Sequence, residues 1–265
     1  MSSPSRIDSS TALYSSFILP QSGVAVSLVY DLITIVPLRQ RGKFITFEGL
    51  DGVGKSTQLE NLATYLRGRG IEVITTREPG GTALGEKLRT VLLSSRTAGL
   101  SPHAELGLMF ADRAQHIDEQ ILPALERGQW VLCDRFTDSS EAYQGGGREL
   151  GSELVLKLHK ALCRDLQPDL TILMVSDVAR TVARARRRNV EHSKTMAEDE
   201  NRFEKENRAF YNRVLAAYMT IAKRAPQRVV PVEAADPIPE VHKKIVGIVE
   251  ERLFSGKPLS QQKTS

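Results

Sequence analysis

The feature that most constrains the fold is a strand, a glycine-rich loop and a helix in immediate succession. Residues 43–48 (KFITFE) are a short apolar run that stops at a glycine, which is typical of a buried parallel strand. Residues 49–57 (GLDGVGKST) contain the pattern Gly-x-x-x-x-Gly-Lys-Ser. Residues 55–68 then place apolar side chains at helical spacing on one face. This succession predicts an α/β fold in which the loop joins the first strand to the first helix.

The glycine-rich loop has the composition of a phosphate-binding loop. Its glycines let the backbone fold around phosphate oxygens, and backbone N–H groups at the start of the helix supply positive potential. We expect Lys55 to reach the β- and γ-phosphates of a nucleoside triphosphate and Ser56 to ligate Mg²⁺. The residues expected to contact ATP are Gly49, Leu50, Asp51, Gly52, Val53, Gly54, Lys55, Ser56 and Thr57.

Strands and helices alternate along the rest of the chain. Further strands are expected at residues 71–75, 130–133, 170–175 and 229–232. Helices are expected at residues 55–68, 82–93, 102–128 with a bend at Pro123, 154–162, 178–187, 201–224 and 239–254. The alternation predicts one five-stranded parallel sheet with helices on both faces.

The two ends of the chain differ from the middle. Residues 1–41 are rich in serine at the start and show little periodicity, so we expect a disordered extension there. Residues 255–265 are polar and are expected to form a flexible tail. Between them, residues 42–254 are expected to form the folded domain.

Composition and charge limit the kinds of partner. The net charge is +4, but no Lys/Arg tract long enough to indicate a nucleic-acid partner is present. The apolar residues 23–37 are too short for a membrane span and contain Asp31, and the segment before them does not resemble a signal peptide. Cys133 and Cys163 make no metal-binding spacing and are expected to be buried thiols in a reducing compartment. We therefore expect a cytoplasmic protein with no membrane partner.

Three classes of protein remain compatible with a phosphate-binding loop: a small-molecule kinase, a switch GTPase, and an ATPase that drives a partner. A switch GTPase should carry Asn-Lys-x-Asp, and no asparagine in this chain precedes a lysine. The apolar strand in residues 130–135 (WVLCDR) ends in Asp134, which can hold Mg²⁺ through water. Arg135 follows at once and can fork onto a second phosphate, which favours a kinase.

Further polar segments follow the predicted strands, where a parallel sheet binds its ligands. Residues 77–82 (REPGGT) follow the second strand, and residues 134–148 (DRFTDSSEAYQGGGR) follow the third. Serine and glutamine side chains can recognise the edge of a base through hydrogen bonds. Several arginines suit an acceptor that is itself anionic, namely Arg77, Arg89, Arg113 and Arg148.

Four segments of the chain together resemble the thymidylate kinase family. They read FEGLDGVGKST, TREPGGT, CDRFTDSSEAYQGGGR and PDLTILM, and the resemblance covers about residues 42–252 in family order and spacing. It implies a P-loop nucleoside monophosphate kinase fold with a short helical lid at about residues 184–203. It also implies an activity, the transfer of phosphate from ATP–Mg to dTMP, which gives dTDP.

The resemblance gives roles to residues at the acceptor phosphate and sugar. Arg77 and Arg135 match the positions that hold the dTMP phosphate, and Arg89 lies nearby in sequence. Tyr143 matches the tyrosine that lies against the deoxyribose and crowds a 2′-hydroxyl. Asp51 matches the loop carboxylate that faces the acceptor.

The resemblance also gives roles at the base. Arg113, Ser140 and Gln144 match the positions that read thymine. The family usually places an aromatic residue four positions before that arginine, where this chain has Met109 followed by Phe110. A methionine can cover a ring, or the helix can rotate to use Phe110. The residues expected to bind dTMP are Asp51, Arg77, Arg89, Met109, Phe110, Arg113, Arg135, Ser139, Ser140, Tyr143 and Gln144.

A further arginine is expected to close over the transferred phosphate. In the family, enzymes without a basic residue among the variable positions of the phosphate loop carry this arginine in the lid, and here these positions hold Leu50, Asp51 and Val53. Arg188 and Arg202 are equal candidates and Arg184 follows, while a solvated basic helix face is the alternative for most of the lid arginines. The residues expected to act in the transfer are Lys55, Arg135, Arg188 and Arg202.

Some alternatives stay open at the level of sequence. The chain fits dTMP kinase best, but another nucleoside monophosphate or deoxynucleoside kinase, or a P-loop protein that binds nucleotide without catalysis, also fits parts of the pattern. We expect a homodimer, as is common in the family. Adenine is expected between the base of the lid and residues 232–241 (VEAADPIPEV).

Overall fold

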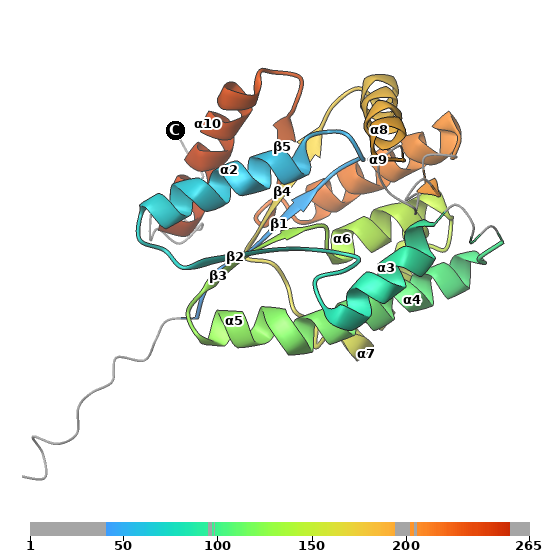
Figure 1. The fold of residues 1–265 in the computed structure, drawn as a ribbon, viewed down its shortest axis with the longest axis horizontal. Helices are drawn as coiled ribbons and strands as arrows, with labels where there is room; N and C mark the ends of the chain where they lie inside the picture. The colour runs from blue at the N-terminus through green and yellow to red at the C-terminus, as the bar shows by residue number, and fades with distance from the viewer. Residues whose placement is uncertain (1–40, 95–96, 98, 194–201, 204–205, 255–265) are drawn as a thin grey trace, which may run out of the picture. The chain divides into compact units, whose positions relative to one another are not determined.

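Five parallel strands form one sheet with the order β2-β3-β1-β4-β5 (Figure 1). The strands are β1 (Phe44–Glu48), β2 (Val73–Arg77), β3 (Trp130–Asp134), β4 (Leu170–Val175) and β5 (Val229–Glu233). All five lie where the sequence predicts them, to within two residues. In the register, Phe47 of β1 pairs with Asp134 of β3 and with Ile172 of β4. The carboxyl ends of β1 and β3 therefore meet at one edge, next to the phosphate loop.

The computed structural model describes residues 41–94, 97, 99–193, 202–203 and 206–254, without the side chains of residues 186 and 188–193. All described elements belong to one unit, residues 39–265. The expected extension, apart from Arg41, and the expected tail lie outside the described residues. Within this part of the chain, no helix combines the length and the apolarity that crossing a membrane requires.

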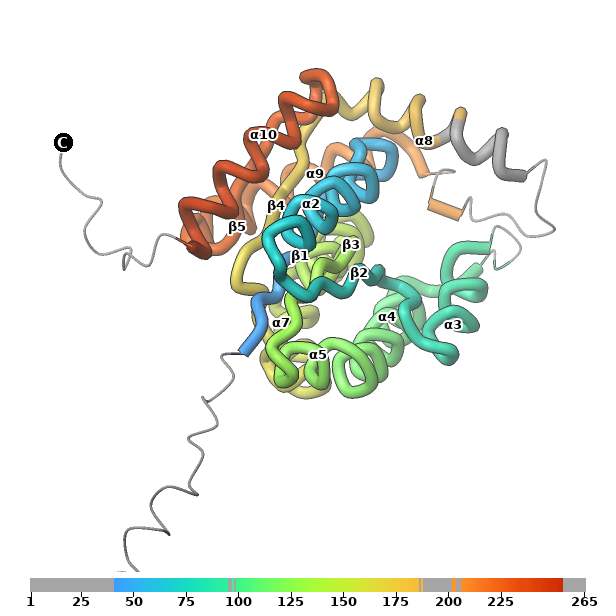
Figure 2. Tube along the Cα trace, turned by 60° about the vertical axis from the view of Figure 1, so that its left-hand side comes forward, coloured from blue at the N-terminus to red at the C-terminus, as the bar shows by residue number. Residues whose placement is uncertain are grey.

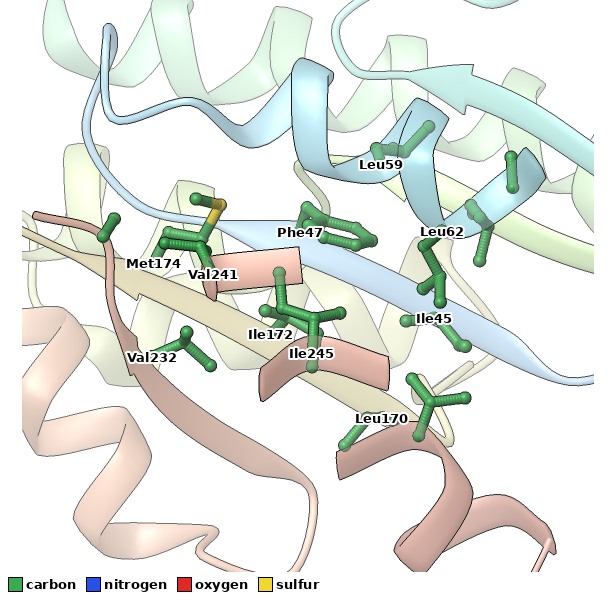
Figure 3. Packing of buried hydrophobic residues seen from close by; sticks show 14 of the residues in the cluster. Ile45, Phe47, Leu59, Leu62, Leu170, Ile172, Met174, Val232, Val241 and Ile245 are labelled. Atoms are coloured by element: carbon green, nitrogen blue, oxygen red, sulfur yellow. The ribbon is translucent and has the colours of Figure 1, made fainter. Parts of the chain in front are cut away.

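One face of the sheet is covered by α2 (Lys55–Gly68) and α10 (Ile238–Val249), which lie side by side in Figures 1 and 2. Because side chains alternate along a strand, Ile45 and Phe47 of β1 point to this face. Figure 3 shows them in the cluster with Leu62 of α2 and Ile245 of α10. These side chains are fully buried, so this face forms a close-packed core layer.

The opposite face is covered by helices that come from the middle of the chain. They are α4 (Pro102–His116), η1 (Ile117–Ile121), α5 (Leu122–Glu126), α6 (Thr137–Ser140), η2 (Glu141–Gly147), α7 (Ser152–Leu162) and α9 (Arg208–Arg224). Phe44 of β1 and Cys133 of β3 belong to the cluster under α4, α5 and α7. Thr46 and Glu48 also alternate onto this face, where both are fully buried. The sheet thus carries a buried carboxylate toward α6 and α9.

Local sequence signals fix several helix ends. Thr82 caps α3 (Ala83–Leu93) by accepting from the Gly85 N–H, and Ser101 caps α4 by accepting from the Ala104 N–H. The predicted helix over residues 102–128 is confirmed, and a π-helical turn (η1) lies just before Pro123, at the predicted bend. α10 continues into a last π-helical turn, η4 (Glu250–Phe254).

One helix starts later than the sequence predicts. The expectation was a helix over residues 201–224, but α9 begins at Arg208. Asn207 is its N-cap, since its Oδ1 accepts from the Phe210 N–H at 2.9 Å. Arg202 and Phe203 therefore lie in a separate short segment, apart from the helix. In contrast, α8 (Val178–Ser193) extends six residues beyond its predicted end at residue 187.

Candidate functional site

The phosphate loop has the backbone that its glycines predict. Gly49 has φ 130° and Gly54, the N-cap of α2, has φ 105°, which are conformations that suit glycine. Lys55 is 5% exposed, and its Nζ donates to the carbonyls of Gly49 and Leu50, each at 3.2 Å. Burial lowers the pKa of Lys55, and the nearby Arg135 lowers it further. An anion next to this ammonium would relieve both effects.

Ser56 and Asp134 lie together at the start of α2 and the end of β3. The Ser56 hydroxyl donates to Asp134 Oδ2 at 2.7 Å. Asp134 Oδ1 is buried and accepts no hydrogen bond from the described residues, and it lies 3.9 Å from Lys55 Nζ. A hydroxyl beside an unused carboxylate oxygen is the hard oxygen set that Mg²⁺ takes in nucleotide sites, so these two residues fit that ion.

Arg135 connects the phosphate loop to the neighbouring pocket. Its backbone is left-handed with φ 74°, which is rare for a residue with a side chain. Its Nη2 donates to Asp51 Oδ1 at 2.7 Å and to the Tyr143 hydroxyl at 3.2 Å. Its Nη1 donates to Ser139 Oγ at 3.0 Å. The unusual backbone thus aims a guanidinium group between the loop and the pocket.

A buried carboxylate supports this arrangement from below. Glu48 Oε1 accepts from the Phe136 N–H at 2.8 Å, next to the left-handed residue. Its Oε2 accepts from the Ser139 hydroxyl at 2.5 Å and from the Tyr218 hydroxyl at 2.9 Å. Burial, together with the nearby Asp138, raises the pKa of Glu48 to about 7. Glu48 therefore joins β1 to α6 and α9 underneath Arg135.

The main pocket lies beside Asp51 and Arg135. Its sides come from the phosphate loop, from α3 and α4, from α6 and η2, and from the segment before α9. Nine of the expected acceptor residues line it. The lining residues are Asp51, Glu78, Pro79, Arg89, Leu93, Met109, Arg113, Arg135, Ser139, Ser140, Tyr143, Gln144 and Phe203.

Arg113 presents a free donor to this pocket. Its side chain is 2% exposed, and its Nε donates to Glu78 Oε2 at 2.7 Å. Its Nη2 donates to Ser140 Oγ at 3.0 Å and to the Phe136 carbonyl at 3.1 Å. Its Nη1 is buried and has no hydrogen-bond partner among the described residues. A buried donor without a partner is costly, so this atom points to a ligand acceptor.

The structure separates Met109 from Phe110. Met109 lines the pocket, whereas Phe110 is fully buried in the core cluster below α4. The Arg113 guanidinium lies 4.9 Å from the centre of the Phe110 ring. Phe110 therefore supports the arginine from behind, and the alternative in which α4 rotates to expose it is not the one seen.

Two expected arginines lie elsewhere. Arg77 is half-exposed and pairs with Glu86 at 3.0 Å, and it borders a shallow hollow with Ser56 and Asp134 but does not line the main pocket. Arg202 is only 10% exposed, and its Nη1 pairs with Glu105 Oε2 at 2.7 Å. Its Nε donates to the Leu92 carbonyl. In this structure neither guanidinium group contacts the phosphate loop through a described bond.

A second hollow lies between α8 and the end of β5. It is lined by Arg180, Ala183, Arg184, Arg187, Ala234, Ala235 and Asp236. The sequence predicts that adenine binds here, between the start of the lid and residues 232–241. The third lid candidate, Arg188, belongs to α8 by its backbone, but its side chain lies outside the described residues.

Several residues of the site carry no signal by themselves in the sequence. Glu48, Glu78, Phe203 and Tyr218 each contact a predicted residue, but over separations of 35 to 91 positions. The motif FEG contains Glu48 and the motif REPGG contains Glu78, so the motifs include two of them. For Phe203 and Tyr218, periodicity indicates only a buried helix face.

This fold and this site define a class. A five-stranded parallel sheet, a phosphate loop and a pocket whose arginine contacts that loop are the features of a P-loop nucleoside monophosphate kinase. The family model for thymidylate kinase matches residues 47–245. The chain belongs to the thymidylate kinase family.

Individual relatives agree with this assignment. A thymidylate kinase of Nitrosomonas eutropha is 49% identical over 212 residues, which is 80% of this chain and 94% of the relative. A thymidylate kinase of Teredinibacter turnerae is 47% identical over 209 residues, which is 79% of this chain and 98% of the relative. The crystal structure of thymidylate kinase from Ehrlichia chaffeensis has a TM-score of 0.62 and 33% identity, and the match covers 79% of this chain and 99% of that one.

Proposed function

We propose that this enzyme transfers the γ-phosphate of ATP to dTMP, giving ADP and dTDP, by direct in-line displacement. The observation that carries the proposal is the bond between Asp51 of the phosphate loop and Arg135 of the pocket, at 2.7 Å. The nucleoside triphosphate site and the main pocket therefore share an edge. A phosphate bound at that edge lies within reach of both.

The main pocket supports a pyrimidine nucleotide as the acceptor. Arg113 and Gln144 offer hydrogen-bonding groups to the pocket, and Arg135 offers its guanidinium next to the phosphate loop. Met109 supplies a polarizable surface for a ring. The Arg135 guanidinium carbon lies 4.9 Å from the centre of the Tyr143 ring. We assign the base to the Arg113 end and the acceptor phosphate to the Arg135 end, with Arg89 beside it.

The chain's own groups supply charge neutralisation for the transfer. Lys55 acts on the donor phosphates and Arg135 on the acceptor phosphate. Asp51 fixes the direction of Arg135. No general base is required, because a phosphate acceptor is already ionised near neutral pH. Phosphoryl transfer needs positioning more than covalent chemistry, which this set of charges provides.

Mg²⁺ fits at Ser56 and Asp134, where no group in the described part of the chain donates to the buried Asp134 Oδ1. When bound, the ion supplies charge neutralisation at the β- and γ-phosphates. Ser56 and Asp134 would hold the ion on the donor side, beside Lys55, whose Nζ lies 3.9 Å from Asp134 Oδ1.

For the lid arginine, we favour α8 over Arg202. Arg184 and Arg187 border the hollow that also contains Ala234 and Ala235, which suits the adenosine part of ATP. Arg184 and Arg188 are four residues apart on one helix, the spacing at which helical residues are neighbours. We expect Arg188→Ala or Arg184→Ala to lower kcat by about 10³-fold, measured at saturating dTMP and ATP. Unchanged kcat in both variants would remove α8 as the source of this arginine.

We also place the enzyme in the cytoplasm as a homodimer. Cys133 and Cys163 are both buried free thiols, as expected for a reducing compartment. Leu106 and Ile117 of the long helix are buried within one chain. Leu84 and Val91 of α3 are more than 40% exposed and offer apolar surface instead. Light scattering coupled to size exclusion measures the oligomeric state.

The test of the activity is an ADP-release assay across dTMP, dUMP, UMP, CMP, GMP and thymidine with ATP and Mg²⁺. We expect the highest kcat/KM with dTMP. A preference for thymidine would contradict the role of Arg135 at an acceptor phosphate. Tight ATP binding without turnover on any acceptor would contradict the activity itself.

A further inference from the structure

We propose that Glu105 is a positioning residue that determines the selectivity for thymine over cytosine, and that Arg202 works with it as a clamp. Glu105 is fully buried in α4 and does not line the main pocket. It acts through two neighbours, Gln144 and Arg202. The inference rests on the proposed function, since it concerns the base that the same pocket binds.

Glu105 receives donors from three residues, which belong to two segments of the chain. Gln144 Nε2 of η2 donates to Oε1 at 2.7 Å, and Arg202 Nη1 donates to Oε2 at 2.7 Å. Arg148, the C-cap of η2, donates through Nε at 3.2 Å and pairs through Nη2 at 3.1 Å. A carboxylate buried so completely needs such partners, and losing one leaves an uncompensated charge.

The first consequence concerns the amide of Gln144. A carboxylate beside two guanidinium groups offers only lone pairs, so the amide must turn its NH₂ toward Glu105. This leaves the amide oxygen as the group that Gln144, which lines the pocket, can offer to a ligand. Glu105 thereby determines that Gln144 accepts and does not donate.

A donor on the same pocket complements the acceptor of Gln144. Arg113 lines the same pocket, and its buried donor Nη1 has no partner in the part of the chain that the structure describes. Arg113 Nη2 donates to Ser140, which lies four residues before Gln144. We infer that the donor of Arg113 and the acceptor of Gln144 match the O4 and N3–H of thymine, respectively. Cytosine instead presents an unprotonated N3 and an amino group at these positions. Its acceptor N3 would face the acceptor oxygen of Gln144, and its donor amino group would face the donor of Arg113. A site built for hydrogen bonds rejects such a mismatch strongly.

A second consequence concerns Phe203. Arg202 holds its segment in place through Glu105, through the Leu92 carbonyl and through its own N–H to the Leu93 carbonyl at 3.1 Å. The next residue, Phe203, lines the pocket and packs edge-on against Tyr143 at 5.6 Å between ring centres. Arg202 therefore positions the pocket wall.

The test compares Glu105→Gln with the wild type in the full-length protein, through calorimetric Kd values for dTMP and dCMP. In the variant, a glutamine at position 105 can donate or accept, so the Gln144 amide is free to turn. We expect the ratio of dCMP Kd to dTMP Kd to fall at least about 10-fold. The matched control is Glu206→Gln, which removes the other carboxylate bound to Arg148 at 2.5 Å but has no bond to Gln144. Its ratio should stay within about twofold of the wild type.

A folded Glu105→Gln protein with an unchanged ratio would overturn the proposal. Thermal unfolding and ATP binding, measured on the same samples, show whether the variant is folded. If the Glu105→Gln protein does not fold, the Arg202→Gln variant tests the clamp. We expect this variant to raise the KM for dTMP about 10-fold, with kcat within about threefold of the wild type. A kcat lower by about 10³-fold at constant KM would make Arg202 a catalytic residue and refute the clamp.

The binding readout keeps the two proposals distinguishable. A wild type that binds dTMP more tightly than dCMP but shows no turnover would contradict the proposed function and leave the Glu105 comparison valid. A wild type that turns over dTMP, together with a folded Glu105→Gln variant of unchanged selectivity, would contradict the role of Glu105 alone.

Discussion

At the scale of single residues, Arg135 is the residue that joins the phosphate loop to the main pocket. It bonds to Asp51, Ser139 and Tyr143 at once, and its backbone occupies the left-handed region. We expect Arg135→Ala to lower kcat/KM for dTMP by about 10²-fold, through a higher KM and a lower kcat, because a charged donor to the acceptor phosphate is lost. ATP affinity should be nearly unchanged in steady-state and binding assays.

Arg164→Ala is the control for this variant. Arg164 also has a positive φ, at 54°, and pairs at the surface with Asp118, away from the pocket. Its removal should leave kcat/KM within about twofold. An equal loss of ATP affinity and dTMP affinity in Arg135→Ala would count against a specific role on the acceptor side.

Glu48 should make stability depend on pH in a predictable direction. Its pKa is raised from 4.5 to about 7 in the folded protein, so the folded state holds this proton more tightly than the unfolded chain does. Protonated Glu48 therefore makes its full contribution to the free energy of unfolding below pH 4.5, and this contribution declines as the pH rises toward 7. The decline is about 3 kcal/mol at 1.36 kcal/mol per pH unit.

Urea unfolding of the wild type and Glu48→Gln between pH 4.5 and 7.5 measures this effect. The difference in unfolding free energy, wild type minus variant, should fall by about 3 kcal/mol as the pH rises. Glu153→Gln, which changes a surface carboxylate paired with Lys157, should show a difference that varies by less than about 0.5 kcal/mol. A flat profile for Glu48→Gln would show that the buried carboxylate does not titrate in this range.

Residues within motifs could be predicted from sequence, whereas their supports could not. Lys55, Ser56 and Asp134 follow from spacing alone, because the loop and the strand end bring them together. Glu48 could not be given its role, because its partners Ser139 and Tyr218 lie 91 and 170 positions away in sequence. Such a role depends on how α6 and α9 pack, which no local pattern encodes.

At the scale of elements, strands were predicted more accurately than the segments around the pocket. A buried parallel strand is a continuous apolar run between glycines, and this signal is local. The segment EAYQGGG forms the π-helical η2 in spite of three glycines, because α9 packs closely against it. Here tertiary packing overrides intrinsic helix propensity.

The contact between η2 and α9 leaves no space for a side chain. A Cβ on Gly147 would lie 2.5 Å from Phe210 Cε2 and 2.8 Å from Val214 Cγ2. We expect Gly147→Ala to lower the free energy of unfolding by about 1–3 kcal/mol, because both neighbours are buried and must shift. Because α9 also carries Tyr218, the KM for dTMP should rise as well.

Gly107→Ala is the matched control in a helix. Gly107 lies exposed in α4, and a Cβ there meets no atom within 4 Å. The free energy of unfolding of this variant should rise by about 0.5–1 kcal/mol, since alanine has a higher helix propensity than glycine. Chemical denaturation of both variants decides the matter, and a Gly147→Ala protein as stable as the wild type would show that α9 can move away at little cost.

At the scale of the whole molecule, every residue that lines a described pocket of this site lies after residue 50. The family match begins at residue 47. The first contacts of the sheet begin slightly earlier, where Asp169 pairs with Arg41 at 3.2 Å and accepts from the Phe44 N–H at 2.8 Å. Phe44 is fully buried and packs edge-on against Phe136, next to Arg135.

These contacts predict different outcomes for two shortened chains. A chain that starts at residue 40 keeps Arg41, Phe44 and all of β1, so its kcat/KM for dTMP should stay within about twofold of the full-length protein. A chain that starts at residue 45 loses the Phe44 side chain, which should cost about 3–5 kcal/mol as a buried aromatic, in addition to the Asp169 contacts. Its melting temperature and its activity should both fall sharply in parallel assays. Loss of activity on removing residues 1–39 alone would instead assign a role in catalysis or folding to that segment.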